Sequence, residues 1–322
     1  MLARFPCRRV VAPPPQALLA PWLAEQLDVR LSSLAPVGGG CIHQAWRLEL
    51  ADGRCLFAKT NRAEALTLLE AEASGLRALG VWARSPLQVP EPQAVGMAGT
   101  LAVLVLPWLA LHGGGGGRAQ DWWDLGRGLA ELHRRSRGGS SGGYGFEADN
   151  FIGSTPQPNT WHRDWAGFFA NCRIAPQLRR AAAAGRPLRG GEQLLAALPR
   201  WLSGHRCEPV LVHGDLWSGN AGLLAPGAGA ALFDPSCHWG DREVDLAMAG
   251  LFGGFPPAFF EGYEHTWPLP PGAGPRAQLY NLYHLLNHAN LFGGGYWGQG
   301  QGSIDRLLAE GEAGFRPWIQ PR

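Results

Sequence analysis

The sequence predicts an α+β protein of two parts, a small β-rich N-terminal lobe and a larger, mostly helical C-terminal lobe. The chain has 322 residues, a length typical of about two domains. Before residue 107, apolar and polar residues alternate in short stretches, two of them separated by an Asp52-Gly53 turn as in a β-hairpin. After residue 107, apolar residues recur mainly at helical spacing. Because 46% of the residues are apolar and 17% charged, we expect an ordered chain.

Residues 1–106 are expected to form the N-terminal lobe. A strand should lead into the turn Gly38-Gly39-Gly40, and helical spacing of Leu66, Leu69 and Ala73 indicates a helix after the hairpin. We expect helices over residues 18–27 and 63–79, and strands over residues 31–37, 42–50, 55–59 and 101–106.

Residues 107–117 are expected to form a hinge and linker, because the glycine run 113–117 favours a flexible loop. The C-terminal lobe should then cover residues 118–322. Its helices are expected over residues 122–133, 165–169, 193–202, 277–291 and 303–311. Two short strands between the third and fourth of these helices should carry the most informative motif of the chain.

Residues 213–220 read HGDLWSGN, and Phe233-Asp234-Pro235 follows. Protein kinases use H-R-D-x-x-x-x-N and then D-F-G, in which the first Asp orients the attacking hydroxyl while the Asn and the second Asp bind Mg²⁺. Asp215 and Asn220 have the same separation as in that motif. The alternative is a surface Asp in a turn with an unrelated Asp on a later strand. The ordered set favours a kinase-like site, with Asp215 catalytic and Asn220 and Asp234 as metal ligands, on a two-lobed protein-kinase-like fold.

The wider wording resembles one family. Residues 213–220, together with GDREVDLAM at residues 240–248, look like the fructosamine kinases, also called ketosamine kinases. That family shares its fold with aminoglycoside and choline phosphotransferases. The resemblance covers most of the chain, since it continues through residues 38–42, 57–61, 70–73, 149–153 and 280–288.

The N-terminal lobe should hold the nucleotide. Lys59 closes a predicted strand and Glu72 lies on the following helix, and in kinases such a pair holds the α- and β-phosphates. Gly38, Gly39 and Gly40 would let backbone N–H groups approach phosphate oxygens. By resemblance, the segment from Leu106 to Leu109 is the adenine-binding hinge. Here Pro107 stands where relatives usually carry an acidic residue, which changes the expected recognition of adenine.

The acceptor side is less defined by the sequence. Trp217, two residues after the catalytic Asp, would either stack on a sugar ring or pack the catalytic loop. Asn287 and His288 lie in the C-terminal helix that walls the acceptor pocket in relatives, and we include them as substrate-binding candidates. Asp241 and Asp245 are expected to anchor the catalytic loop and a helix start rather than to touch substrate.

Charge and cysteine usage restrict the partners and the compartment. The net charge of +2, without a basic run, gives no reason to expect nucleic-acid binding, and no apolar stretch is long enough to cross a membrane. Six cysteines without a C-x-x-C pair fit a reducing cytoplasm. The triplet Pro13-Pro14-Pro15 interrupts any amphipathic targeting helix, so we expect a short leader. Cys41 follows the glycine turn, and by resemblance it could make the protein a redox-dependent dimer instead of a monomer.

The resemblance implies an ATP- and Mg²⁺-dependent kinase acting on the 3-hydroxyl of ketosamines. The acceptor would be a fructosamine or ribulosamine adduct on a small molecule or a protein, and the role would be protein repair by deglycation. Two alternatives stay open at this stage. One is a kinase of another small hydroxyl compound, such as a choline- or aminoglycoside-like acceptor, and the other is a redox-sensing nucleotide-binding protein.

Overall fold

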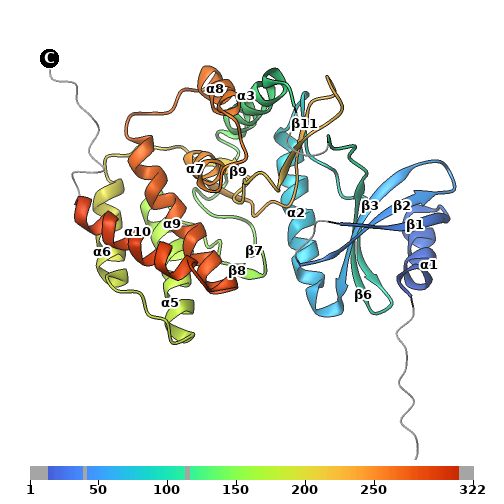
Figure 1. Ribbon diagram of the computed structural model, residues 1–322, viewed down its shortest axis with the longest axis horizontal. Helices are drawn as coiled ribbons and strands as arrows, with labels where there is room; N and C mark the ends of the chain where they lie inside the picture. The colour runs from blue at the N-terminus through green and yellow to red at the C-terminus, as the bar shows by residue number, and fades with distance from the viewer. Residues whose placement is uncertain (1–13, 39–41, 113–116, 312–322) are drawn as a thin grey trace, which may run out of the picture. The chain divides into compact units, whose positions relative to one another are not determined.

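The computed structural model describes residues 14–38, 42–112 and 117–311 (Figure 1). Contacts between Cα atoms divide the chain into two compact units. The first comprises Met1–Glu70 and Pro92–Trp108, and the second Ala71–Glu91 and Leu109–Arg322. Residues 71–91 thus belong to the second unit although they precede part of the first in the sequence.

The first unit is built on an antiparallel sheet of five strands in the order β1-β2-β3-β6-β5 (Figure 1). Helix α1 (Pro15–Leu27) packs its buried Leu19, Trp22 and Leu23 into the core of this unit. The hairpin predicted at Asp52-Gly53 joins β2 to β3. The strands are β1 (Leu31–Val37), β2 (Gln44–Leu50), β3 (Cys55–Arg62), β5 (Ala94–Ala98) and β6 (Leu101–Pro107). Of these, β5 was not predicted, because Gly96 interrupts its β-residue pattern.

A 3₁₀ turn, η1 (Ala63–Ala65), leads into α2 (Leu66–Trp82), which confirms the helix predicted over 63–79. After α2 come β4 (Leu87–Gln88), in the second unit, and then the last two strands of the first unit.

The second unit is mostly helical, as predicted. Its helices are α3 (Ala119–Ser136), α4 (Trp165–Phe168), the π-helix η2 (Phe169–Ile174), α5 (Ala175–Ala183), α6 (Gly191–Leu202), α7 (Glu243–Leu251), α8 (Pro257–Thr266), α9 (Ala273–Phe292) and α10 (Tyr296–Glu310). Its short strands besides β4 are β7 (Asn150–Ile152), β8 (Thr155–Gln157), β9 (Val210–Val212), β10 (Ala221–Leu223), β11 (Ala230–Leu232) and β12 (His238–Gly240). These strands form small sheets in the orders β10-β11-β4, β12-β9 and β7-β8.

Glycines allow α3 and α8 to approach closely. A Cβ atom at Gly126 of α3 would lie 1.9 Å from the carbonyl oxygen of Phe259, and one at Gly262 of α8 would lie 2.0 Å from that of Trp123. Since no side chain fits at such distances, glycine is required at both positions. This helix pair and the short strands enclose one core cluster, and α4, α6 and α9 surround a second one.

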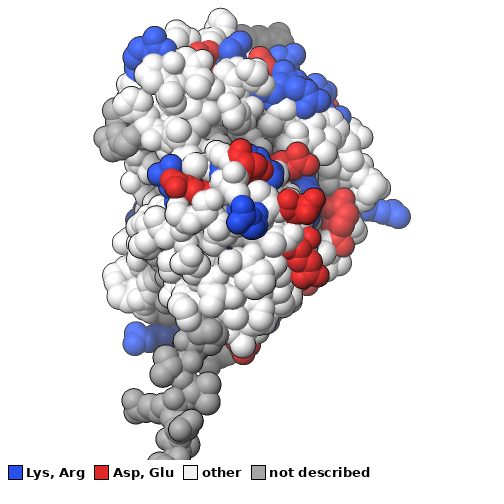
Figure 2. All heavy atoms as spheres, turned by 90° about the vertical axis from the view of Figure 1, so that its right-hand side faces the viewer, with Lys and Arg blue, Asp and Glu red and all other residues white. Residues whose placement is uncertain are grey.

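Two further features concern the helices and the molecular surface. None of the helices in the described ranges is long and apolar enough to cross a membrane. On the face drawn in Figure 2, charged side chains gather in groups that contain both signs, and wide uncharged areas lie between these groups.

Candidate functional site

The HGDLWSGN segment forms the loop between β9 and β10, as its position between two predicted strands required. Two backbone hydrogen bonds close it, from Trp217 N to Asp215 O (3.1 Å) and from Asn220 N to Trp217 O (2.9 Å). Gly214 has φ +80°, and a Cβ there would lie 2.2 Å from the carbonyl oxygen of Ser236. Only glycine therefore lets this loop lie against the segment after Asp234.

Asn220 joins the two halves of the site. Its Nδ2 donates to the backbone oxygen of Asp215 (2.9 Å), to the Oδ2 of Asp215 (3.2 Å) and to the backbone oxygen of Asp234 (3.3 Å). Because Nδ2 is used in this way, the amide oxygen Oδ1 is the atom that can serve as a ligand. The structure thus brings together the three residues that the spacing D-x-x-x-x-N…D selected.

His213 links the loop to the chain around Asp234. Its Nε2 lies 2.9 Å from the carbonyl oxygen of Phe233, and its Nδ1 lies 3.3 Å from the backbone nitrogen of Asp215. Burial lowers the pKa of His213, so the ring is neutral at physiological pH. Since a carbonyl can only accept, Nε2 carries the proton and Nδ1 accepts from Asp215.

The electrostatics of the site favour a cation. Burial, followed by the negative charge of Asp234, raises the pKa of the partly buried Asp215 to about 7. The carboxylate of Asp234 and the amide oxygen of Asn220 are oxygen ligands of the kind that hard divalent cations such as Mg²⁺ prefer. The residues therefore fit the predicted metal, because a cation bound among them would offset the repulsion between the two carboxylates.

Asp245, in the first turn of α7, supports the catalytic loop from behind. Its two carboxylate oxygens accept from the backbone nitrogens of His213 and Gly214, each at 2.8 Å. His133 of α3 lies 3.2 Å from the same carboxylate, and both side chains are fully buried. Burial alone would raise the pKa of Asp245, but the hydrogen bond and charge of His133 hold it below its ordinary value. The predicted role of Asp245 as an anchor is confirmed.

Sequence reasoning assigned no role to the β7–β8 hairpin, which supports the chain after Asp234. Asn150 Nδ2 donates to the carbonyl oxygen of Cys237 (2.8 Å), and Gln157 Nε2 donates to that of Ser236 (3.2 Å). In return, Ser236 Oγ donates to the carbonyl oxygen of Phe151 (2.7 Å). The available signal was the DNFIG segment, a polar pair beside apolar residues that belongs to no helical pattern.

The predicted nucleotide residues lie on several elements. Lys59 is buried on β3, with Ala45 of β2 and Leu104 of β6 as its neighbours across the sheet. Glu72 lies on α2, in the part assigned to the second unit, and it is half-buried. The pairing of Lys59 with Glu72 stays a prediction.

The predicted hinge follows β6, which ends at Pro107 opposite Leu56 of β3. The carbonyl oxygen of Leu109 accepts from Leu111 N at 2.9 Å. Gly38 directly follows β1, whereas Gly39, Gly40 and Cys41 lie outside the described residues.

The acceptor candidates differ in accessibility. Trp217 is 41% exposed, and its ring covers Gly219, where a Cβ would lie 2.2 Å from it. Asn287 is buried and its Oδ1 accepts from Gln177 at 3.3 Å, an interaction within the helical core. The half-buried ring of His288 contacts three aromatic rings, those of Phe252, Phe292 and Tyr296. Trp217 and His288 are thus the candidates that a ligand could reach directly.

Comparisons with known proteins agree on one group. A family model described as fructosamine kinase matches residues 17–310. The chain is 41% identical over 298 residues to a probable ketoamine kinase of Synechocystis, covering 90% of this chain and 97% of that protein. It is 36% identical over 290 residues to the chloroplastic protein-ribulosamine 3-kinase of Arabidopsis thaliana, covering 89% and 86%. A crystal structure from Thermobifida fusca assigned as a fructosamine-3-kinase has a TM-score of 0.78 at 31% identity, covering 90% and 98%.

Proposed function

We propose a function from one premise: this chain belongs to the fructosamine kinase family. It is an ATP-dependent kinase that phosphorylates a hydroxyl group of ketoamines, and the acceptor is the 3-hydroxyl of fructosamine or ribulosamine adducts. The observation that carries this proposal is the convergence of Asp215, Asn220 and Asp234 on two loops that are hydrogen-bonded to each other. This arrangement is typical of enzymes that transfer a phosphoryl group to an alcohol.

Asp215 orients the acceptor hydroxyl. In phosphoryl transfer, a carboxylate beside the nucleophile accepts its hydrogen bond and then its proton. A pKa of about 7 suits this role, since the carboxylate can take a proton without being protonated throughout the physiological range. The hydrogen bond from Asn220 Nδ2 to Oδ2 holds one oxygen of Asp215 and leaves the other for the substrate.

Asn220 Oδ1 and the carboxylate of Asp234 would hold the Mg²⁺ ion, which when bound neutralises charge on the phosphates of ATP. Lys59 of the first unit would hold the α- and β-phosphates, and Glu72 of α2 would fix its ammonium group. Gly38, Gly39 and Gly40 would line the phosphate loop, and Pro107 and Leu109 would contact adenine. Support for these assignments is the position of Lys59 on the central strand β3 and of Gly38 at the end of β1.

The biological role that follows is repair of glycated amines in a reducing compartment such as the cytoplasm. A phosphate on the 3-hydroxyl, which is on the carbon next to the ketone, makes the adduct prone to loss of the sugar. Among the described cysteines, Cys55, Cys172, Cys207 and Cys237 are free thiols, which fits that compartment.

The proposal is tested by measuring ATP consumption with a panel of acceptors. Ribulosamine and fructosamine conjugates of lysine should be phosphorylated at the 3-hydroxyl, identified by mass spectrometry and NMR of the product. Choline and an aminoglycoside serve as controls for the wider phosphotransferase fold. Equal or better kcat/KM with choline would refute the acceptor assignment. The kinase site would be refuted if none of the acceptors is phosphorylated in a reaction that requires Asp215.

A further inference from the structure

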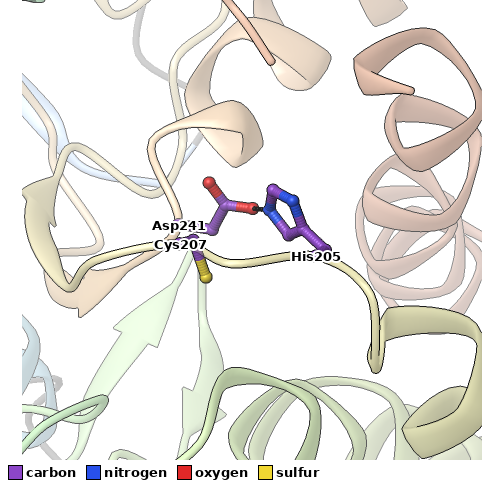
Figure 3. A group of neighbouring side chains, drawn as sticks. All are labelled: His205, Cys207 and Asp241. Carbon is purple, nitrogen blue, oxygen red and sulfur yellow. Dashed lines mark hydrogen bonds and ion pairs between the residues drawn. The ribbon is translucent and has the colours of Figure 1, made fainter. Parts of the chain in front are cut away.

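A second group of side chains able to bind a metal lies in the second unit, away from the loop oxygens just described. His205 and Cys207 lie between α6 and β9, and Asp241 lies between β12 and α7. In Figure 3 the ring of His205 points at the carboxylate of Asp241, and the sulfur of Cys207 lies beneath this pair. One ligand atom from each of the three residues lies within 4.8 Å of the other two.

We propose that His205, Cys207 and Asp241 form a site for a zinc-like divalent cation. Imidazole nitrogen, thiolate and carboxylate are the ligands that zinc prefers, whereas Mg²⁺ prefers oxygen alone. A point within about 2.8 Å of all three atoms exists, since this is the circumradius of an equilateral triangle with a 4.8 Å side. Zinc bonds to these atoms measure about 2.0–2.3 Å, which places neighbouring ligand atoms of a tetrahedral site about 3.3 Å apart. His205 Nε2 and Asp241 Oδ2 lie 2.6 Å apart, so the cation would replace their hydrogen bond and separate the two atoms slightly, while the sulfur of Cys207 would move towards it.

The carboxylate of Asp241 is already held in place for this role. Its Oδ2 accepts from the hydroxyl of Tyr280 at 2.7 Å and lies 2.6 Å from His205 Nε2, and its Oδ1 accepts from the backbone nitrogen of Glu243 at 3.2 Å. Tyr280 is in turn held by the indole nitrogen of Trp165 at 3.0 Å. Such outer contacts orient metal ligands and are a regular part of zinc sites.

Glu243 lies beside the three residues and adds a second carboxylate to their surroundings. Its Oε1 lies 3.9 Å from His205 Nε2, and its carboxylate also accepts two hydrogen bonds from Arg276, at 2.7 and 2.8 Å. The charges around the bound cation sum to zero. The Cys207 thiolate and the carboxylates of Asp241 and Glu243 carry three negative charges, and the divalent cation and the Arg276 guanidinium carry three positive ones, so the occupied site can remain buried. Binding releases the thiol proton of Cys207 to solvent, and the neutral ring of His205 binds through Nε2 with its proton on Nδ1. No oxidant or other reactant is needed.

The position of the site connects it to the catalytic loop. Strand β9 starts three residues after Cys207 and pairs with β12, which ends immediately before Asp241. Asp245, which holds the loop, follows Asp241 by four residues and lies in the first turn of α7. A cation bridging the two segments would therefore clamp both chains that lead into the loop.

Cobalt(II) titration tests the site without measuring activity. Thiolate ligation produces a near-ultraviolet charge-transfer band and a tetrahedral site produces strong visible bands, whereas cobalt on oxygen ligands shows neither. Chelator-treated, reduced protein in excess Mg²⁺, which occupies the oxygen site, should bind one Co²⁺ per chain with both features. The band should disappear in Cys207→Ala and Cys207→Ser, and it should persist in Cys172→Ser, which removes a buried thiol elsewhere in the second unit.

Zinc affinity gives the second measurement. Competition with a chromophoric chelator should show at least a tenfold weaker affinity for Zn²⁺ in His205→Gln. Circular dichroism and the Tm of the metal-free variants establish that each one folds, and zinc should raise the Tm of the wild type but not of Cys207→Ala. A cobalt spectrum without the charge-transfer band, or one that Cys207→Ala leaves unchanged, would show that these residues form only a hydrogen-bonded His–Asp pair and would overturn the proposal.

Discussion

Ionisation of Asp215 carries an electrostatic cost in the folded protein. Its carboxyl is partly buried, it lies near the charge of Asp234, and its pKa rises to about 7 for both reasons. A surface Asp would have a pKa of about 3.9. The site thus holds a group whose ionised form is unfavourable in the native protein, and this cost makes the group suited to accept a proton at neutral pH.

Asp215→Asn should abolish phosphoryl transfer while leaving nucleotide binding largely intact. The amide has the shape of the carboxylate but cannot accept the hydroxyl proton, so kcat should fall by about 10²–10⁴. Coupled ATP-consumption assays with a ketoamine and fluorescence titration with a nucleotide analogue measure the two effects. Asp305→Asn, on the exposed part of α10, is the matched control and should change neither. Turnover close to that of the wild type would refute the assignment.

The same substitution should change how stability depends on pH. Since the folded-state pKa of Asp215 is raised, its contribution to stability is fully present below about pH 4 and is lost as pH rises towards and through 7. Asp215→Asn removes this loss. The quantity to compare is the free energy of unfolding of the variant minus that of the wild type. This difference should be larger at pH 8 than at pH 5 by on the order of 1–2 kcal/mol.

Urea unfolding of both proteins at the two pH values, with chelator present, measures this difference, in which the titration of all other groups cancels. A difference between the two proteins that does not change with pH would mean that Asp215 titrates normally in the folded protein.

At the scale of elements, α7 holds the catalytic loop through its first turn. Asp245 accepts the backbone N–H groups of two successive loop residues, His213 and Gly214, and it does so without access to water. His133 of α3 and Tyr263 of α8 extend the support, since His133 Nδ1 lies 2.9 Å from the Tyr263 hydroxyl. Three helices thus determine the position of one loop.

Asp245→Asn should destabilise the protein by about 2–4 kcal/mol. The amide accepts a weaker hydrogen bond from His133 than the carboxylate does, and its NH₂ group would face a backbone N–H that needs an acceptor. Urea unfolding measures the loss of stability, and ATP-consumption assays should show lower kcat in the folded fraction because the loop is less well held. Asp305→Asn again serves as the control. Unchanged stability would show that water or another group satisfies the loop nitrogens.

Helix prediction succeeded where one face is apolar and failed where this pattern is absent. Residues 122–133 were predicted as a helix and lie within α3, whereas α7 was expected only as a helix start near Asp241 and Asp245, without an end. Residues 243–249 of α7 are all buried, including Glu243 and Asp245, so the helix has no polar face to reveal its period. Helix α10 begins seven residues before the prediction, because Gly298, Gly300 and Gly302 weaken the helical signal there.

At the scale of the whole molecule, we expect the oligomeric state to depend on Cys41, which lies outside the described residues. The resemblance of residues 38–42 to the phosphate loop of fructosamine kinases leads us to expect a monomer when reduced and a disulfide-linked dimer after mild oxidation. A thiolate among N–H groups that attract anions is readily oxidised. Non-reducing gels after dilute peroxide should show a dimer band that dithiothreitol removes.

Cys41→Ala is the test variant and Cys55→Ala is the control, because Cys55 lies on β3 and is also a free thiol. The dimer should disappear only in the first variant. Equal dimer formation in both variants, or none in the wild type, would contradict the expectation.

The sequence by itself determined the chemistry and much of the architecture. The D-x-x-x-x-N…D spacing selected three residues that the structure brings together, and the Asp52-Gly53 turn and the strand pattern predicted the hairpin of the first unit. These features could be read because they depend on spacing along the chain, which local geometry converts directly into loops, strands and turns.

Only the tertiary structure decided which distant residues support the site. Asn150 and Gln157 hold the chain after Asp234 from about 80 residues away in sequence, and His205 meets Asp241 across 36 residues. Neither set has a spacing that identifies it, because contacts between separate elements depend on how the elements pack. The raised pKa of Asp215 has the same origin. It arises from burial and from the charge of Asp234, which are properties of the folded chain.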